Sequence, residues 1–314
     1  MRILVVGGAG YIGSHAVRRL LAGGHEVCVL DNLAAGHREA VPEGLLTVGD
    51  LMDRDGLAAI LKAGAFDGVM HFAAHTSVPE SVADPAKYYR NNVVGSLNLL
   101  DAMRAAGVAR IVFSSTAATY GIPAEVPIKE SAPKQPINPY GFTKLVIETA
   151  LADYARAYGL GFAALRYFNA CGAAADASIG EDHAPESHLI PLVLQVALGQ
   201  RESVSIFGTD YPTPDGTCVR DYIHVEDLAE AHALVLEQIR PGAGLTYNLA
   251  TGTGYSVRQV VEAARRVTGL PIPTVEKPRR DGDPHLAVLH LSRNFGHQPA
   301  VTAGIDREIG RAHV

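Results

Sequence analysis

The chain alternates short apolar runs, rich in β-branched residues, with longer segments whose apolar residues recur at helical spacing. The short runs predict buried strands, and the longer segments predict amphipathic helices. Strands and helices in this alternation indicate a parallel sheet that is covered by helices on both faces. The predicted strands are residues 2–6, 26–30, 45–48, 68–72, 110–114 and 161–166, and the predicted helices lie near 11–22, 54–63, 86–106 and 139–158.

The pattern changes after about residue 170. The second half has more proline, less regular alternation and two long loops, at 173–187 and 209–220. We therefore expect a Rossmann-like, doubly wound α/β domain over residues 1–170 and a smaller C-terminal α/β domain over residues 171–314, with some chain crossing back to the sheet. The smaller domain is expected to close over the carboxyl edge of the large sheet, where such sheets bind their ligands.

Charge and cysteine content narrow the classes of function. The 314 residues carry a net charge of −6, which gives no basic surface of the kind that attracts nucleic acid or an anionic membrane. No apolar run approaches the ~20 residues of a membrane span. The cysteines, Cys28, Cys171 and Cys218, lie far apart without metal-ligand spacing, and they predict reduced thiols in a cytoplasmic protein. No nucleic-acid or membrane partner is expected.

The first predicted strand ends in a glycine-rich turn that leads into a helix. Gly7, Gly10 and Gly13 allow a tight turn, close approach of a pyrophosphate and close packing of the helix on the strand. The start of the helix offers unpaired amide groups and the positive end of its dipole to the phosphates. Asp31, at the end of the next strand, is placed to bind a ribose hydroxyl and to repel a 2′-phosphate. The motif therefore predicts NAD as the cofactor in preference to NADP.

A second group of residues carries candidate chemistry. Tyr140 and Lys144 open the helix after Pro139, and their i, i+4 spacing places both on one helix face. The cation is expected to lower the pKa of the Tyr140 phenol toward the range of a general base. Thr116, after the fifth strand, is expected to hydrogen-bond the reacting oxygen. These groups would remove a proton from a hydroxyl while hydride leaves the same carbon, a step that begins net redox, epimerisation and dehydration alike.

The Gly-x-x-Gly-x-x-Gly spacing resembles the extended branch of the short-chain dehydrogenase/reductase superfamily. The resemblance implies that the segments after the third and fourth strands contact adenine and pyrophosphate, and that Lys144 also holds the nicotinamide ribose. Sugar-nucleotide 4,6-dehydratases of similar sequence carry an acidic residue where this chain has Ala117 and Ala118, so dehydration is disfavoured. The implied cofactor-binding residues are Gly7, Gly10, Tyr11, Ile12, Gly13, Asp31, Asn32, Asp50, Leu51, Phe72, Ala73, Ala74, Asn91, Ser114, Tyr140, Lys144 and Phe168.

Three stretches of the second half resemble the UDP-glucose 4-epimerase family. They are RYFNACG at 166–172, HLIP at 188–191, and the block at 205–224 that ends in YPTPDGTCVRDYIH. The resemblance extends from residue 1 to about residue 284, and it implies that 205–207 bind uracil and that two arginines hold the diphosphate. The implied catalytic residues are Tyr140, Lys144 and Thr116, and the implied substrate-binding residues are Thr116, Asn169, His188, Leu189, Ser205, Ile206, Phe207, Arg220, Arg280 and Asp283.

The activity that this resemblance implies is interconversion of UDP-glucose and UDP-galactose, in galactose metabolism, by an isomerase with tightly bound NAD. Hydride leaves C4 of the sugar while Tyr140 takes the O4 proton, and a 4-keto intermediate turns before the hydride returns. A homodimer packed through the helices near 86–106 and 139–158 is also implied. Two alternatives remain open: epimerisation of another UDP-sugar, such as a UDP-N-acetylhexosamine or UDP-pentose, and a non-catalytic NAD-binding sensor.

The likeness to the family ends beyond Pro284. The last seven residues, 308–314, read like a translated sequencing adapter, and we hypothesise that residues 285–314 are a non-native sequencing or assembly artefact. By straight counting, the family's gate position falls on Ala287, and a small residue there would admit N-acetylated hexoses.

No metal site is expected from the sequence. His71 and His75 have the spacing of helical metal ligands but lie at the end of a predicted strand, so metal binding by this pair is not expected. His183 and His188 lack supporting ligand partners in the sequence pattern.

Overall fold

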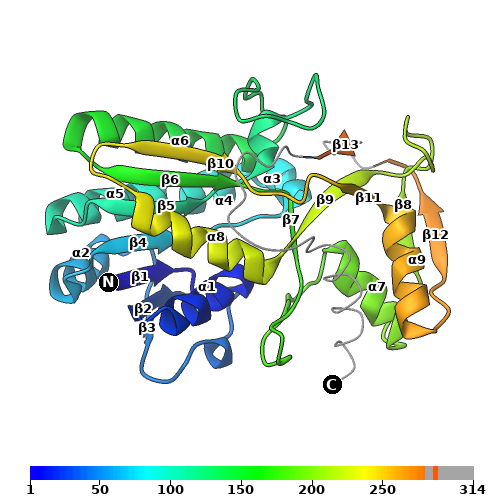
Figure 1. Cartoon of the computed structure of the whole chain (residues 1–314), viewed down its shortest axis with the longest axis horizontal. Coiled ribbons are helices and arrows are strands. Elements are labelled where there is room, and N and C mark those ends of the chain that lie inside the picture. Colours follow the sequence, from blue (N-terminus) through cyan, green and yellow to red (C-terminus); the bar gives the residue numbers. More distant parts are fainter. Residues whose placement is uncertain (280–285, 289–314) are drawn as a thin grey trace.

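The computed structural model describes residues 1–279 and 286–288. Its centre is a seven-stranded sheet with the order β10-β6-β5-β4-β1-β2-β3, in which every neighbouring pair is parallel (Figure 1). The predicted Rossmann-like α/β fold is therefore confirmed. The strands are β1 (Arg2–Val6), β2 (Glu26–Asp31), β3 (Leu46–Val48), β4 (Gly68–His71), β5 (Arg110–Ser114), β6 (Gly161–Arg166) and β10 (Gly244–Asn248).

Helices cover both faces of this sheet, and β1 shows why. Ile3 and Val5 are buried in one core cluster, whereas Leu4 and Val6 are buried in another, since successive side chains of a strand point to opposite faces. The first cluster includes α1 and α8, and the second includes α2, α5 and α6, which lie on the opposite side in Figure 1. These helices are α1 (Tyr11–Ala22), α2 (Arg54–Gly64), α5 (Gly95–Ala106), α6 (Pro139–Tyr158) and α8 (Val225–Gln238).

Two details differ from the predicted elements. The helix expected near 86–106 is present, but its first part includes a π-helical segment, η2 (Tyr89–Val94), between α4 (Pro85–Tyr88) and α5. A short helix, α3 (Val78–Ala83), precedes it and was not predicted; Ser77 caps it by accepting a hydrogen bond from the amide of Glu80. A π-helical turn shifts the phase of the helix, so a single apolar periodicity does not describe the whole stretch.

The second half of the chain contributes to two regions. α8 and β10 belong to the large sheet and its covering layer, because α8 packs against α1 and β10 pairs with β6. The rest forms two small sheets with α7 and α9, whose apolar faces share a core cluster. The elements of this smaller part are β7 (Asn169–Cys171), α7 (Leu189–Ala197), β8 (Val204–Phe207), β9 (Val219–His224), β11 (Gly254–Ser256), α9 (Val257–Thr268), β12 (Thr274–Lys277) and β13 (Leu286–Ala287). The larger part also contains the 3₁₀ turns η1 (Arg38–Ala40) and η3 (Ala117–Tyr120).

Within residues 1–279 and 286–288, no helix is both long enough and apolar enough to cross a membrane. The hypothesis about a non-native tail concerns residues that lie outside this described part, except for residues 286–288. Residues Leu286–Ala287 form β13, which pairs with β9 in parallel.

Candidate active site

The glycine turn after β1 leaves space that a side chain would fill. Gly7 has a φ of +80°, and a Cβ on it would lie 2.4 Å from the amide nitrogen of Ala73. A Cβ on Gly13 would lie 2.1 Å from the carbonyl oxygen of Gly7. Gly10 is the N-cap of α1 and brings no capping side chain to the first turn of the helix. The turn thus presents helix amides at close range and fits a dinucleotide pyrophosphate.

Asp31 fixes the shape of this turn. One of its carboxylate oxygens accepts a hydrogen bond of 2.9 Å from the amide of Ala9, and the other accepts one of 2.8 Å from the amide of Leu33. The carboxylate therefore joins the glycine turn to the end of β2, where it was predicted to meet the cofactor ribose. A fixed negative charge at this position suits NAD better than NADP.

The other predicted cofactor residues form contacts around this edge of the sheet. Asn32 donates a hydrogen bond of 2.8 Å to Asp50. The hydroxyl of Tyr11 donates a hydrogen bond of 2.5 Å to the carbonyl oxygen of Gly172, so the first helix contacts the start of the long loop in the second half. Phe168 packs in a small cluster that contains Ala117, the residue after Thr116.

The local sequence explains how α6 presents its first turn. Asn138 caps the helix by accepting a hydrogen bond of 2.8 Å from the amide of Gly141, and Pro139 occupies the first helical position. Tyr140 follows directly. The Thr116 side chain interacts with the Tyr140 phenol and lowers its pKa, so the predicted pair from α6 and the end of β5 does come together.

Lys144 is buried and contacts the end of β5. Its Nζ donates a hydrogen bond of 2.8 Å to the carbonyl oxygen of Ser114 and lies 4.8 Å from the centre of the Phe113 ring. Burial lowers the pKa of Lys144 to about 7, and the charge of Glu148 works in the opposite direction. The lysine therefore changes its charge near neutral pH.

The predicted effect of Lys144 on Tyr140 is wrong for this structure. Burial raises the pKa of Tyr140 to about 12, and the hydrogen bond to Thr116 is what lowers it. The reason is that the Nζ of Lys144 is directed at a main-chain carbonyl, and its own burial disfavours the charged form. In the ligand-free protein, the phenol is accordingly a neutral proton donor.

A buried polar network supports the catalytic strand and helix, and sequence reasoning missed it. Arg166 donates to both oxygens of Glu148, at 2.8 and 2.5 Å, and Ser115 donates to Glu148 at 2.6 Å. The other guanidinium nitrogen of Arg166 donates to the hydroxyl of Tyr120 at 2.7 Å. Glu148 stands one turn after Lys144, so its i, i+4 spacing was the available signal.

Asn92 is a second residue that the sequence analysis overlooked. Its side chain is fully buried, accepts a hydrogen bond from the amide of His75 at 2.8 Å, and donates to the carbonyl of His75 at 3.0 Å. It also donates to Thr143 on α6 at 3.2 Å. The predicted cofactor residue, Asn91, donates to Asn92 at 3.0 Å. Asn92 thus joins the loop after β4 to the helix that carries Tyr140.

The predicted substrate residues lie in the smaller part of the fold. Asn169 donates a hydrogen bond of 3.1 Å to the carbonyl of Asp221 on β9, the strand that also carries Arg220. Residues 205–207 form most of β8, which pairs with β12, and Leu189 starts α7. Arg280 and Asp283 lie outside the described residues.

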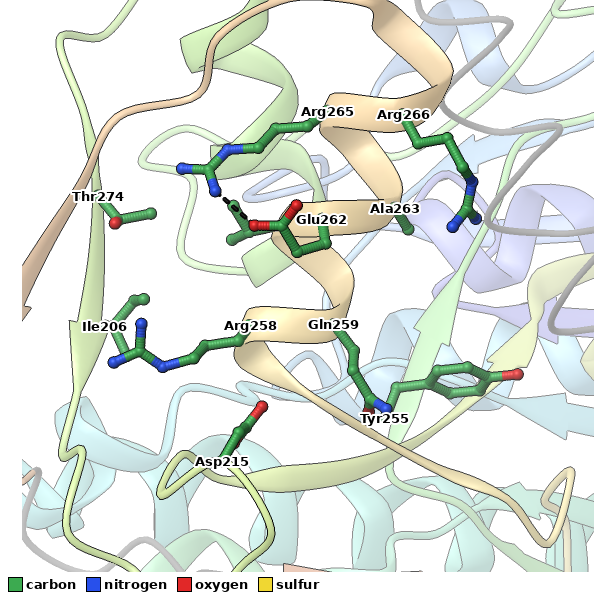
Figure 2. Close-up of a pocket in the computed structure, with 11 residues that line it drawn as sticks. Ile206, Asp215, Tyr255, Arg258, Gln259, Glu262, Ala263, Arg265, Arg266 and Thr274 are labelled. Atoms are coloured by element: carbon green, nitrogen blue, oxygen red, sulfur yellow. Dashed lines mark hydrogen bonds and ion pairs between the residues drawn. The ribbon is translucent and has the colours of Figure 1, made fainter.

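A separate pocket of about 470 Å³ lies beside α9. Figure 2 shows Arg258 and Arg265 on the side of α9 that faces Ile206 and Thr274, whereas Arg266 lies on the opposite side. Of the predicted site residues, the pocket shares Ile206 alone, and none of the predicted catalytic groups lines it. The chemistry is therefore assigned from the geometry at Thr116 and Tyr140, and not from this pocket.

One expectation about histidines is also wrong. His183 and His188 do have neighbours of metal-ligating type, because Glu181 and Glu186 lie beside them in the loop before α7. The sequence did not reveal this, since the four residues lie in an irregular loop whose conformation no periodicity predicts.

Comparison with known proteins agrees with the geometry. Residues 3–250 match the family described as NAD dependent epimerase/dehydratase family. The UDP-glucose 4-epimerase of Halalkalibacterium halodurans is 56% identical over 285 residues, which are 90% of this chain and 85% of that protein. The crystal structure of UDP-glucose 4-epimerase from Brucella ovis in complex with NAD superposes with a TM-score of 0.89 at 46% identity, covering 98% of this chain and 96% of that chain.

The crystal structure of UDP-glucose 4-epimerase from Bifidobacterium longum in complex with NAD+ and UDP superposes with a TM-score of 0.91 at 37% identity, covering 99% of this chain and 97% of that chain. The fold, the glycine turn and the Thr116–Tyr140 pair are thus found in a chain that is similar to these proteins over nearly its whole length. The resemblance inferred from the motifs is confirmed: the chain belongs to the NAD dependent epimerase/dehydratase family, and within it to the UDP-glucose 4-epimerases.

Proposed function

We propose that this protein is an NAD-dependent 4-epimerase that interconverts UDP-glucose and UDP-galactose. The observation that carries the proposal is the hydrogen-bonded pair of Thr116 and Tyr140, with Lys144 one turn further along α6, at the carboxyl end of β5. The relatives support the substrate, since they are UDP-glucose 4-epimerases, and the similar structures hold NAD or NAD+ and UDP.

The chemistry assigned to the chain is proton transfer at O4 of the hexose. NAD, when bound, supplies the carbon that accepts a hydride from C4 and returns it. Tyr140 takes the O4 proton and later gives it back, with its hydroxyl oriented by Thr116. Lys144 is able to change its charge near neutral pH, so it can balance the charge that develops on the phenol. Ala117 and Ala118 bring no acidic group for elimination of water, which favours epimerisation.

The two parts of the fold are assigned different ligands. We assign NAD to residues 1–170 together with α8 and β10, and the UDP-sugar to the remainder of residues 171–314. Arg220 on β9 is the described arginine assigned to the diphosphate, because a planar guanidinium suits bidentate phosphate contact. The proposal includes a cytoplasmic location, supported by Cys28, Cys171 and Cys218, which form no disulfide within the described chain.

A homodimer is part of the proposal. The helices expected to pack at its interface carry large apolar side chains on their outer surface. Tyr89 and Val94 on η2 are 40% and 42% exposed, Phe142 on α6 is 44% exposed, and the rings of Tyr89 and Phe142 lie 6.3 Å apart. Exposed apolar groups gathered on neighbouring helices are typical of an interface. Light scattering on Phe142→Glu, compared with the unsubstituted protein, tests the assignment: a fall from dimer to monomer mass supports it, and a monomeric unsubstituted protein contradicts it.

The test of activity uses the purified protein without added NAD. Conversion of UDP-galactose is followed through UDP-glucose dehydrogenase, and a separate aliquot is denatured to release and quantify NAD. Turnover together with retained NAD supports the proposal. Retained NAD without turnover of any UDP-sugar would support the non-catalytic sensor instead.

A second substrate class is favoured by one observation. β13 pairs with β9 so that Ala287, at the counted gate position, stands opposite Arg220 in the backbone register. Alanine is a small residue, so a gate at this position would admit an N-acetylated hexose. Comparison of kcat/KM for UDP-N-acetylglucosamine and UDP-glucose tests this substrate: a ratio below about 1 in 1,000, or ~4 kcal/mol of discrimination, contradicts it.

A further inference from the structure

Four side chains of metal-ligating type converge in the loop between β7 and α7. They are Glu181, His183, Glu186 and His188, and each offers one ligand atom within 4.8 Å of the others. Of this group, His188 alone was predicted to contact the substrate, and the proposed proton and hydride transfers use none of the four. Imidazole nitrogens and carboxylate oxygens are both ligand types that zinc takes in proteins.

The four separations between histidine and glutamate ligand atoms are close to those around a single ion. Ligands held about 2.0–2.2 Å from a tetrahedral zinc ion lie roughly 3.3–3.6 Å from one another. The Nδ1 of His183 lies 3.4 Å from Glu181 and 3.6 Å from Glu186. The Nδ1 of His188 lies 2.8 Å from Glu181 and 3.2 Å from Glu186. The other pairs of ligand atoms lie within 4.8 Å of one another, so seating the ion requires the set to contract by up to about 1 Å.

The burial of the carboxylates indicates that the cluster is built to hold positive charge. The side chains of Glu181 and Glu186 are only 8% and 5% exposed. Glu186 is oriented by the amides of Ser187 and His188, which donate to it at 2.6 and 2.8 Å. Two buried carboxylates are costly unless cations neutralise them.

The Nδ1 of His183 gives a second, independent indication. It is shielded from solvent, it points between the two carboxylates, and it makes no hydrogen bond of normal geometry to any described residue. The nitrogen forms ion pairs with both carboxylates at distances longer than a normal hydrogen bond, so a metal ion placed between the three groups would bond it more closely than its present partners do.

We propose that Glu181, His183, Glu186 and His188 bind one zinc ion that fixes the loop between β7 and α7. The loop touches the cofactor side of the fold, because the rings of His183 and Tyr11 meet edge to face at 6.4 Å and Asp182 accepts a hydrogen bond from His37. At its other end, His188 is the N-cap residue of α7. The ion would thus join the glycine turn to the smaller part of the fold, in a structural role.

The test measures metal directly, on full-length protein whose affinity tag has been removed. We expect elemental analysis to find about one equivalent of zinc per chain, and the zinc-stripped protein to recover its melting temperature when Zn²⁺ is added back. Competition with a chromophoric chelator gives the affinity. Co²⁺ added in place of zinc reports tetrahedral ligation through its visible absorption.

Variants then locate the ion. Glu181→Gln and His183→Gln are expected to weaken zinc binding at least 100-fold, whereas His25→Gln, which removes a histidine outside the cluster, is expected to leave it unchanged. Stripped unsubstituted protein whose melting temperature does not respond to Zn²⁺ overturns the proposal, and the cluster is then an ion-pair network alone. Equal zinc content in all the variants overturns it as well, because the ion then lies elsewhere. Since the stripped and reloaded protein is tested without substitution, a variant that fails to fold does not prevent a decision.

Discussion

The Nζ of Lys144 donates a hydrogen bond of 2.8 Å to the carbonyl oxygen of Ser114, at the end of β5. The helix α6 is thereby attached to the strand that precedes Thr116, and the hydroxyl of Tyr140 meets that of Thr116 beside it. In the ligand-free protein, this arrangement keeps the lysine easy to deprotonate and the phenol neutral. The positive charge of the NAD nicotinamide, once bound nearby, would lower the pKa of the Tyr140 phenol, so the phenol could act as a base at lower pH.

The buried lysine predicts a pH dependence of stability. Burial lowers the pKa of Lys144 to about 7 in the folded protein, whereas an unfolded lysine titrates near about 10.4. Between these values the unfolded chain binds more protons, so this group makes the free energy of unfolding rise with pH from about 7 to about 10. Urea denaturation of NAD-free protein at pH 7 and pH 9 measures the rise. Lys144→Met is the control, and an equal pH dependence in both proteins would contradict the assigned burial.

The ion pair of Glu148 and Arg166 predicts a large loss of stability when it is broken. Glu148→Gln leaves a buried guanidinium without its counter-charge, which costs about 3–5 kcal/mol. Glu262→Gln, which removes an exposed partner of Arg265, should change stability by less than about 0.5 kcal/mol. Urea denaturation of both variants at pH 7 measures the two losses in the free energy of unfolding. If both losses are small and similar, the buried network contributes little to stability.

Alanine substitutions at two glycines of the turn should affect different properties: one the stability of the fold, the other the affinity for NAD. Alanine at Gly13 would place its Cβ 2.1 Å from a carbonyl oxygen, so the NAD-free protein should lose stability. Alanine at Gly10 meets its nearest described neighbour at 3.5 Å, an ordinary contact. Alanine is a poorer N-cap than glycine, by up to about 1 kcal/mol, but it loses about 0.4–1 kcal/mol less backbone entropy on folding, so the NAD-free protein should keep most of its stability. NAD retention should still fall about tenfold or more in Gly10→Ala, because the side chain projects where the pyrophosphate approaches. Calorimetry with NAD checks both variants, and undiminished affinity in Gly10→Ala would contradict the assigned phosphate position.

The hydrogen bond between Thr116 and Tyr140 predicts a kinetic signature. Thr116→Val removes the group that lowers the pKa of Tyr140, so the pH at which kcat rises should move upward. A hydrogen bond to a developing charge is worth about 1.5–3 kcal/mol, so kcat should fall roughly 10- to 150-fold. Thr116→Ser restores the hydroxyl and should recover most of the rate. A uniform loss of rate in both variants, with no shift of the pH profile, would assign Thr116 a packing role instead.

The sequence was sufficient for those parts of the protein that follow a repeating pattern. β1 and α1 were predicted with their observed bounds, because apolar alternation and helical periodicity report directly on burial. The glycine turn and the Tyr140–Lys144 pair were found through fixed spacings. The direction of the pKa shift at Tyr140 was predicted wrongly, because spacing places Lys144 on the correct helix face but does not say which acceptor its Nζ reaches.

Other parts depend on contacts between segments that no local pattern connects. Asn92 is important because its amide reaches both His75 and Thr143, which lie on different elements. Glu181 meets His188 through the path of an irregular loop. β10 returns to the large sheet long after β6, and its position follows from three-dimensional packing alone. These features could not be derived from periodicity or spacing.

The central claim is that Tyr140 transfers the O4 proton during 4-epimerisation with NAD retained by the protein. The most direct measurement compares the turnover of UDP-galactose by unsubstituted protein and by Tyr140→Phe, both without added NAD, with bound NAD quantified after denaturation. The account predicts equal NAD content and a loss of kcat of about 10²–10⁴-fold in the variant. Equal NAD content with undiminished turnover would contradict it.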